Sequence, residues 1–95
     1  MNKINEEKLE RWSEFFKALS HPTRLKIILT LIEKGEICVK SMCDILETTQ
    51  SNISQHLSIL KNANIIKYKK KGMLNCYEIT DNRVKEILKI ISDNE

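Results

Sequence analysis

Apolar residues recur at three- and four-residue intervals along the first third of the chain, and this spacing predicts two amphipathic helices. The apolar stripe of the first helix consists of Leu9, Trp12, Phe15, Phe16 and Leu19. The stripe of the second helix consists of Leu25, Ile27, Ile28, Leu29, Leu31 and Ile32. Pro22 disfavours helical geometry at His21 and suits the first turn of a new helix, so we expect the break between the helices there. Gly35 favours the end of the second helix.

A short helix, a tight turn and a second helix are predicted for the middle of the chain. Residues 35–39 are too few for a helix and rich in strand-forming residues, so they predict a brief strand before a third helix at about residues 39–46. The fourth helix spans residues 48–63, and its apolar seam consists of Ile53, Leu57 and Leu60. Thr49 is a good N-cap for this helix, with its hydroxyl placed for the backbone N–H of Asn52. This succession is the helix-turn-helix arrangement.

The last third of the chain predicts a β-hairpin followed by a fifth helix. Apolar residues alternate with polar ones along the two strands, namely Ile66, Tyr68, Tyr77 and Ile79, and the turn is expected at residues 71–72. Helical spacing then returns in Val84, Ile87, Leu88 and Ile91. Asp81 is placed to cap that helix. The order of elements indicates a mainly α fold with a small β-hairpin, a winged helix-turn-helix of five helices plus a wing, in one domain over residues 1–95.

Composition supports one helical domain and argues against several classes of protein. A chain of 95 residues holds one modest hydrophobic core, and 2 glycines and 1 proline do not suit a loop-rich scaffold. No window reaches the roughly 18 consecutive apolar residues of a membrane span, and residues 1–10 lack the apolar core of a signal peptide. We therefore expect a cytoplasmic protein without membrane contact. The chain carries no paired carboxylates, catalytic triad or phosphate-binding glycine loop, so we expect no enzymatic activity.

The outer face of the fourth helix carries side chains suited to reading DNA. The second helix of a helix-turn-helix enters the major groove, where amides pair with adenine and hydroxyls meet bases or phosphates. The candidate DNA-binding residues of this helix are Thr49, Gln50, Ser51, Asn52, Ser54, Gln55 and His56. For His56, a contact to a phosphate and a contact to a base are equally expected. A plain solvated helix face fits less well, because the rest of the chain uses Lys and Glu on its outer faces.

A cluster of lysines in the predicted wing is the strongest local charge feature. The net charge of +3 is modest, but four lysines fall within residues 67–71. Lys69, Lys70 and Lys71 are candidate contacts to DNA phosphates, which position a protein without specifying a sequence. The alternative is a charge run that keeps an edge strand soluble. Arg24, near the start of the second helix, is expected to be structural or to contact the DNA backbone.

The segments FKALSHPTRLKIILTL, EICV and TTQSNISQHLSILKNANII, followed by the lysine-rich wing, resemble the ArsR/SmtB family of transcriptional repressors. The resemblance runs from about residue 9 to residue 91, and ALSHPTRLKI and QSNISQHLSIL are its most specific parts. It implies a homodimer packed through the first and last helices, binding of double-stranded DNA at an operator, and release when an inducer binds. The chain supports the dimer independently, because two amphipathic terminal helices on so small a domain need their apolar stripes covered.

The residues at the family's inducer sites differ in this chain. Where arsenic-responsive members carry Cys-Val-Cys, the chain has Cys38, Val39 and Lys40, and Cys43 falls where some of those members place a further thiol. Zinc-responsive members use His and acidic residues in the last helix, and residues 81–95 contain no His. We therefore expect no required cofactor, and the inducer stays open, with a thiophilic metal or an oxidant as candidates.

Three cysteines, Cys38, Cys43 and Cys76, are the candidate effector thiols. Their odd number and spacing argue against a disulfide framework or a four-thiolate zinc site in one chain, so reduced thiols are the default. Cys43 is expected to pack in the core, and strand alternation places Cys76 on the more exposed face. Cys38 and Cys43 would point about 140° apart on one α-helix and could not share an ion. If the short strand pairs with the return strand, Cys38 and Cys76 come within reach of each other. Lys40 and the helix start would stabilise a Cys38 thiolate.

Two other classes of function are open. The first alternative is a thiol redox or metal-buffering protein on a winged-helix scaffold. The second is a winged-helix module for protein interactions. Salt-dependent binding to duplex DNA separates a DNA-binding regulator from the first class. DNA binding that is indifferent to the wing lysines would favour the second class.

Overall fold

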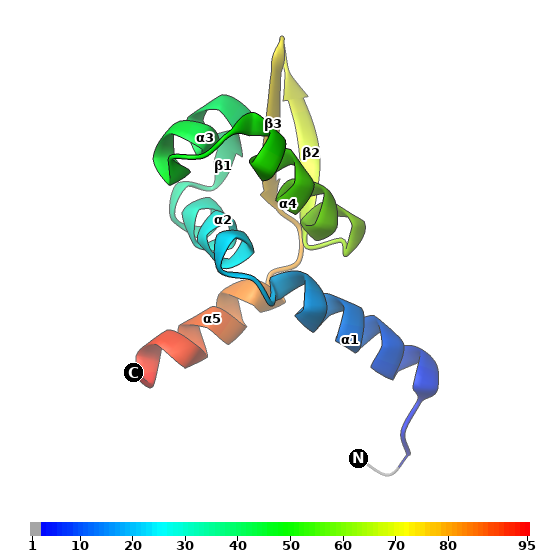
Figure 1. Cartoon of the computed structure of the whole chain (residues 1–95). Coiled ribbons are helices and arrows are strands. Elements are labelled where there is room, and N and C mark those ends of the chain that lie inside the picture. The colour runs from blue at the N-terminus through cyan, green and yellow to red at the C-terminus, as the bar shows by residue number, and fades with distance from the viewer. Residues whose placement is uncertain (1–2) are drawn as a thin grey trace.

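The helices and strands follow one another in the predicted order (Figure 1). The structure is a computed structural model, and it describes residues 3–95. Its elements are α1 (Glu6–Leu19), α2 (Pro22–Lys34), β1 (Glu36–Cys38), α3 (Val39–Leu46), α4 (Gln50–Asn62), β2 (Ile66–Lys71), β3 (Leu74–Ile79) and α5 (Arg83–Asp93). Five helices and a small antiparallel sheet confirm the mainly α, winged helix-turn-helix fold.

Side-chain chemistry sets the boundaries of α2. His21 lies in extended backbone, and its Nδ1 accepts a hydrogen bond from the backbone N–H of Thr23 at 3.0 Å. Pro22 is the first residue of the helix, where its missing N–H costs nothing, so the predicted break is confirmed. Gly35 follows the helix with a φ of 85°, a conformation that side chains with a Cβ rarely adopt.

The wing is the hairpin of β2 and β3. Residues opposite each other in the hairpin include Ile66 with Ile79, Tyr68 with Tyr77, and Lys71 with Leu74. The turn therefore consists of Gly72 and Met73, one residue later than predicted, because Lys71 still finds a pairing partner at the end of its strand. Gly72 has a φ of 60°, which suits glycine at a tight turn.

The predicted short strand is present as β1 and joins the wing into a sheet of strand order β1-β3-β2. It pairs antiparallel with β3, and this register sets Glu36 opposite Glu78 and Cys38 opposite Cys76. The return strand of the wing is therefore the central strand, and its edge is covered by the residues that lead directly into α3.

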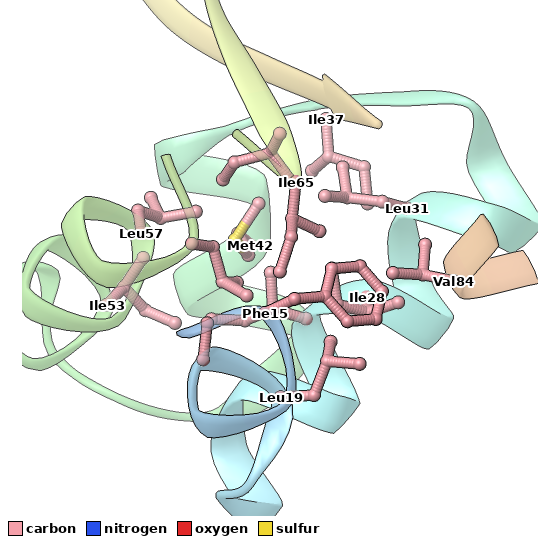
Figure 2. Packing of buried hydrophobic residues seen from close by; sticks show 14 residues of the cluster. Phe15, Leu19, Ile28, Leu31, Ile37, Met42, Ile53, Leu57, Ile65 and Val84 are labelled. Atoms are coloured by element: carbon pink, nitrogen blue, oxygen red, sulfur yellow. The ribbon is translucent and has the colours of Figure 1, made fainter. Parts of the chain in front are cut away.

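The core lies between the helices and the base of the wing (Figure 2). Met42 of α3 is fully buried, and Ile53 and Leu57 of α4 point toward it. The other core residues include Phe15, Ala18, Leu19, Ile27, Ile28, Leu31, Ile37, Leu60, Ile65, Ile66 and Val84. Each large apolar side chain buried here stabilises the fold by about 1.5 to 3 kcal/mol. The apolar seam of α4 thus faces inward and leaves its polar face to solvent.

The helix α1 projects from the end of the molecule opposite the wing (Figure 1). Only the last part of its apolar stripe is covered by its own chain, since Phe15 and Leu19 are buried. Leu9, Trp12 and Phe16 are exposed, with 57% of Phe16 accessible to solvent. This helix therefore carries an uncovered apolar surface.

The helix α5 projects from the same end and is also partly uncovered (Figure 1). Val84 is buried, whereas Ile90 and Ile91 are exposed to 63% and 52%. The N-cap residue of this helix is Asn82, whose side chain makes no capping hydrogen bond, so the cap expected at Asp81 is displaced by one residue. Asp81, one residue earlier, still accepts a hydrogen bond at Oδ1 from the backbone N–H of Arg83 at 3.1 Å. Within residues 3–95, no helix combines the length and apolar character needed to cross a membrane.

Candidate nucleic-acid interface

The outer face of α4 is polar and open to solvent. Its exposed residues are Gln50, Ser51, Ser54, Gln55 and Ser58, which together line a shallow hollow of about 580 Å³. Four of the five were predicted from the sequence, and Ser58 was missed. The signal for Ser58 was its place four residues after Ser54, which is one helical turn along the same face. The face offers hydrogen-bond donors and acceptors without a charged side chain before Lys61.

Two of the predicted DNA-binding residues build the turn between α3 and α4. Thr49 Oγ1 accepts a hydrogen bond from the backbone N–H of Asn52 at 3.1 Å, as predicted. Asn52 is half-buried, and its Nδ2 donates to Thr48 Oγ1 at 3.0 Å, so its amide is not on the outer face. Glu47 closes α3 with a φ of 51°. These contacts hold the start of α4 at a defined angle to α3.

His56 points away from the outer face on which the sequence placed it. Its Nδ1 lies 3.2 Å from Arg24 Nη1, and its ring centroid lies 4.5 Å from that of His21. The side chain is half-buried because one turn after Asn52 the helix surface meets the start of α2. Burial lowers the pKa of His56, and the neighbouring His21 and Arg24 lower this pKa further. The neutral imidazole is therefore favoured, with Nδ1 free to accept a hydrogen bond.

Three of the wing lysines share one face of β2 and lie beside acidic residues of the sheet. Lys67 Nζ is 3.1 Å from Glu78 Oε1. Lys69 Nζ is 3.6 Å from Glu36 Oε1, and Lys71 pairs with the other oxygen of Glu36. The hydrogen bond from Lys71, and then the charges of both lysines, lower the pKa of the Glu36 carboxyl. The lysine side chains are about half exposed, so their ammonium groups can exchange these carboxylates for other anions.

Lys70 lies on the opposite face of β2 from these three lysines. Strand alternation groups it with Tyr68, whose hydroxyl donates to Asn75 Oδ1 at 2.6 Å. Lys61, near the end of α4, places its Nζ 5.9 Å from the centroid of the Tyr68 ring. Neither Lys70 nor Lys61 has an acidic partner among residues 3–95. This face of the wing therefore carries uncompensated positive charge next to α4.

The structure joins Cys38 and Cys76 in a disulfide, so the expectation that β1 brings these thiols together is confirmed. The expectation of reduced thiols is wrong for this pair, because strand pairing places two residues 38 apart opposite each other. The prediction that strand alternation leaves Cys76 on the more exposed face is wrong for this side chain, because Cys76 is fully buried. Cys76 does share the face of Lys69, but it sits on the central strand and is covered by its bonded partner. Cys43 retains a free thiol and packs, half-buried, against the core as expected.

A hollow of about 380 Å³ lies between α3, the start of α4 and the tip of the wing. Cys38 and Cys43 both line it, together with Gln50 of the outer face of α4. The expectation that these two cysteines point apart assumed one continuous helix, whereas Cys38 ends β1 and only precedes α3. Within residues 3–95, no three His, Cys, Asp or Glu side chains are grouped so that they could hold one metal ion.

The chain is similar in sequence and in structure to known transcriptional regulators. Residues 21–68 match the model of the family described as bacterial regulatory protein, arsR family. An uncharacterized HTH-type transcriptional regulator of Methanocaldococcus jannaschii is 48% identical over 92% of this chain and 98% of its own length. The arsenical resistance operon repressor of Bacillus subtilis is 38% identical over 93% of this chain and 84% of its own. The structure of the transcriptional repressor PagR of Bacillus anthracis superimposes with a TM-score of 0.82 at 31% identity, covering 92% of this chain and 99% of that one.

Proposed function

Because the chain belongs to the arsR family of bacterial regulatory proteins, we propose that this transcriptional regulator binds operator DNA as a homodimer and represses transcription. The observation that carries the proposal is the outer face of α4, which presents amides and hydroxyls over a shallow hollow and buries its apolar seam. Because duplex DNA is the proposed partner, we also propose a cytoplasmic location.

The geometry of α4 divides the candidate residues by role. Gln50 and Ser51 are at the N-terminal end of the helix, which lies nearest the base edges when a recognition helix enters the major groove. Ser54 and Gln55 follow one turn later on the same face and extend the reading surface. Amide and hydroxyl groups both donate and accept, so they suit the mixed pattern of the major groove.

We assign the wing lysines to phosphates. Lys70 carries a free ammonium group beside α4, and it is the first candidate for a contact to the DNA backbone. Lys69 and Lys71 can follow by exchanging the carboxylate of Glu36 for phosphates, since surface ion pairs of this kind contribute little to stability. Such contacts supply affinity for any sequence, whereas α4 supplies the choice among sequences.

The uncovered stripes of α1 and α5 support the homodimer. Trp12 and Phe16 on one helix, and Ile90 and Ile91 on the other, are exposed at the same end of the molecule. A symmetric dimer through these helices removes both apolar surfaces from water. It also places two copies of α4 in a fixed relation, which is what a DNA site with two half-sites requires.

For the inducer, the disulfide between Cys38 and Cys76 favours an oxidant over a metal ion. Oxidation by hydrogen peroxide removes two electrons and two protons from the two thiols, breaks the O–O bond and releases two molecules of water as the S–S bond forms. The bond ties the residue before α3 to the central strand of the wing. A change in wing position is therefore the expected consequence of a change in its redox state. The described residues fit a metal less well, since they bring no three ligands together.

The test of DNA binding is an anisotropy titration with a duplex containing the protein's own promoter and with a shuffled duplex of equal composition. We expect tighter binding to the promoter, and affinity for both duplexes that falls as salt rises, because bound lysines release counterions. Failure to bind either duplex at low salt would contradict the proposal and favour a protein-interaction module.

A further inference from the structure

One guanidinium group, carried by α2, contacts both α1 and α4 at the place where these helices meet. Arg24, in the first turn of α2, donates from Nε to the carbonyl oxygen of Ala18 at 2.6 Å. Its Nη2 donates to the carbonyl oxygen of Lys17 at 3.4 Å. Its Nη1 lies 3.2 Å from Nδ1 of His56 on α4. The group is half-buried, so these protein atoms replace much of its water.

The contacts to α1 follow from how that helix ends. The last carbonyls of a helix lack N–H partners within the helix and carry partial negative charge. Ser20 N–H reaches the carbonyl of Lys17 at 3.1 Å, and the Arg24 side chain supplies the donor for Ala18. A guanidinium suits this place because its planar donors stay charged and reach several acceptors at once.

The contact to α4 is held from both sides. His56 accepts from Arg24 while its ring rests against that of His21. His21 is itself fixed, because its Nδ1 accepts the backbone N–H of Thr23 as the cap of α2. In the part of the chain that the structure describes, this is the side-chain hydrogen bond that joins α4 to the helices preceding β1.

We propose that Arg24 is a positioning residue for DNA recognition, one that sets the angle of α4 relative to α1 without touching DNA. The inference rests on the proposed dimer through α1 and α5, in which that angle determines how the two reading helices are spaced. Half-sites recur at about 34 Å, one turn of the duplex, so both helices must be placed together. A loosened junction still lets one α4 enter a groove, but it weakens simultaneous binding of two.

The experiment compares wild type, Arg24→Ala and Arg24→Lys on three DNA duplexes. The first is the duplex that wild type selects most strongly from random sequences, the second contains one half of that duplex, and the third is unrelated. We expect Arg24→Ala to weaken binding to the selected duplex about tenfold, as for loss of a hydrogen bond to a charged group. Binding to the other two duplexes and their salt slopes should change little. Lys26→Ala, which removes an exposed charge from the same helix, is the control.

Arg24→Lys separates charge from geometry, since an ammonium keeps the charge but cannot span Ala18 and His56 as the planar fork does. We expect the Arg24→Lys variant to lose affinity for the selected duplex as well. If the alanine variant does not fold, the lysine variant provides the test. A second measurement is a double-mutant cycle with His56→Ala. If the two residues act as one unit, the double variant loses no more affinity than either single variant.

Three results would overturn the inference. Equal losses on all three duplexes, with a salt slope reduced by about one, would make Arg24 a phosphate contact. Unchanged DNA affinity of both Arg24 variants would show that Arg24 has no role in recognition. Additive losses of affinity in the double-mutant cycle would show that Arg24 and His56 act independently. A wild-type protein that prefers no duplex would instead contradict the proposed function, so the two failures are distinguishable.

Discussion

Neighbouring side chains of α4 have different surroundings, and this decides what each can do. Gln50 and Gln55 reach open solvent, whereas Asn52 and His56 on the same helix are satisfied within the protein. The amides on the outer face are open to partners outside the chain, and in the proposed complex these partners are base edges. Lys70 on the wing is equally free, but a point charge recognises phosphate and no particular base.

Gln50→Ala and Lys70→Ala should therefore lose DNA affinity in different ways. Loss of the Gln50 amide should cost about 1 to 3 kcal/mol on the selected duplex and little on unrelated DNA. Loss of the Lys70 charge should weaken binding to every duplex and lower the salt slope by about one. Titrations on both duplexes over a range of salt measure the two effects. Indistinguishable behaviour of the variants would contradict the roles assigned to α4 and the wing.

A second residue-level prediction concerns acid stability. The hydrogen bond from Arg83 lowers the pKa of Asp81, so the folded state favours the carboxylate. This contribution is present above about pH 4, the ordinary pKa of Asp, and is lost as pH falls through the lowered pKa of the folded state. Asp81→Asn should reduce the free energy of unfolding by about 0.5 kcal/mol at pH 7, the value of a negative charge at a helix start.

Urea unfolding of wild type and Asp81→Asn at pH 7 and pH 3 measures that difference. The difference between the two proteins should be smaller at pH 3 than at pH 7, because protonation of the Asp81 carboxylate begins to remove its contribution below the ordinary pKa of Asp. Asp93→Asn, at the opposite end of α5, is the matched control and should not lower the free energy of unfolding at pH 7, since a negative charge does not stabilise a helix C-terminus. A difference that stays constant between the two pH values would show that charge on Asp81 is not its cause.

At the scale of elements, β1 links the helix-turn-helix to the wing. It is only three residues long, yet it covers the central strand, ends in Cys38 and leads directly into α3. The disulfide to Cys76 and the pairing of Glu36 with the wing lysines both lie on this strand. The strand β1 is therefore in direct contact with the wing through a covalent bond and two ion pairs.

Oxidation should weaken operator binding through Cys38 and Cys76 together. We expect hydrogen peroxide to lower the affinity of the reduced wild type about tenfold, a usual size for coupling between two sites. Cys38→Ser and Cys76→Ser should abolish this response, and Cys43→Ser should respond like wild type because its thiol is outside the bonded pair. DNA titrations before and after peroxide, with arsenite and cadmium in separate series, check the prediction. Equal binding by all four proteins under every condition would leave the cysteines as packing residues.

At the scale of the molecule, the helices α1 and α5 leave one end of an otherwise folded domain apolar. The molecule measures 49 × 30 × 20 Å, and its wing and its uncovered helices lie at opposite ends (Figure 1). The proposed surfaces for DNA recognition and for self-association are therefore separate. A change at one surface can be tested without altering the residues of the other.

Ile90→Glu should dissociate the proposed dimer. Ile90 is 63% exposed in one chain, so a glutamate there leaves the core intact, whereas Leu88 packs against the core and would confound the result. An unpaired charge buried between subunits costs about 3 kcal/mol, roughly a hundredfold in the dissociation constant. Sedimentation should show a monomer, and the operator should be bound weakly. Lys89→Glu, at the adjacent exposed position, should stay dimeric. A wild-type protein that is monomeric at micromolar concentration contradicts the dimer.

The sequence by itself determined the elements and most of their ends. The apolar spacing of α4, the cap at Thr49, the restart at Pro22 and the contact of Asp81 with the first residue of α5 all depend on residues within one helical turn of each other. Such local preferences are written in the order of residues and do not need the rest of the fold. The outer face of α4 followed for the same reason, since a buried seam leaves the opposite side of a helix exposed.

Only the tertiary structure decided where His56 points and how far Cys76 is buried. Arg24 and His56 are 32 residues apart, and Cys38 and Cys76 are 38 apart, so no local pattern specifies that they meet. Alternation grouped Cys76 with Lys69 on one face of the hairpin, but the burial of Cys76 depends on β1 pairing along the other edge of its strand. Burial and partnership are properties of distant segments brought together by the core, and the same packing gives Arg24 its place between the terminal helix and the reading helix.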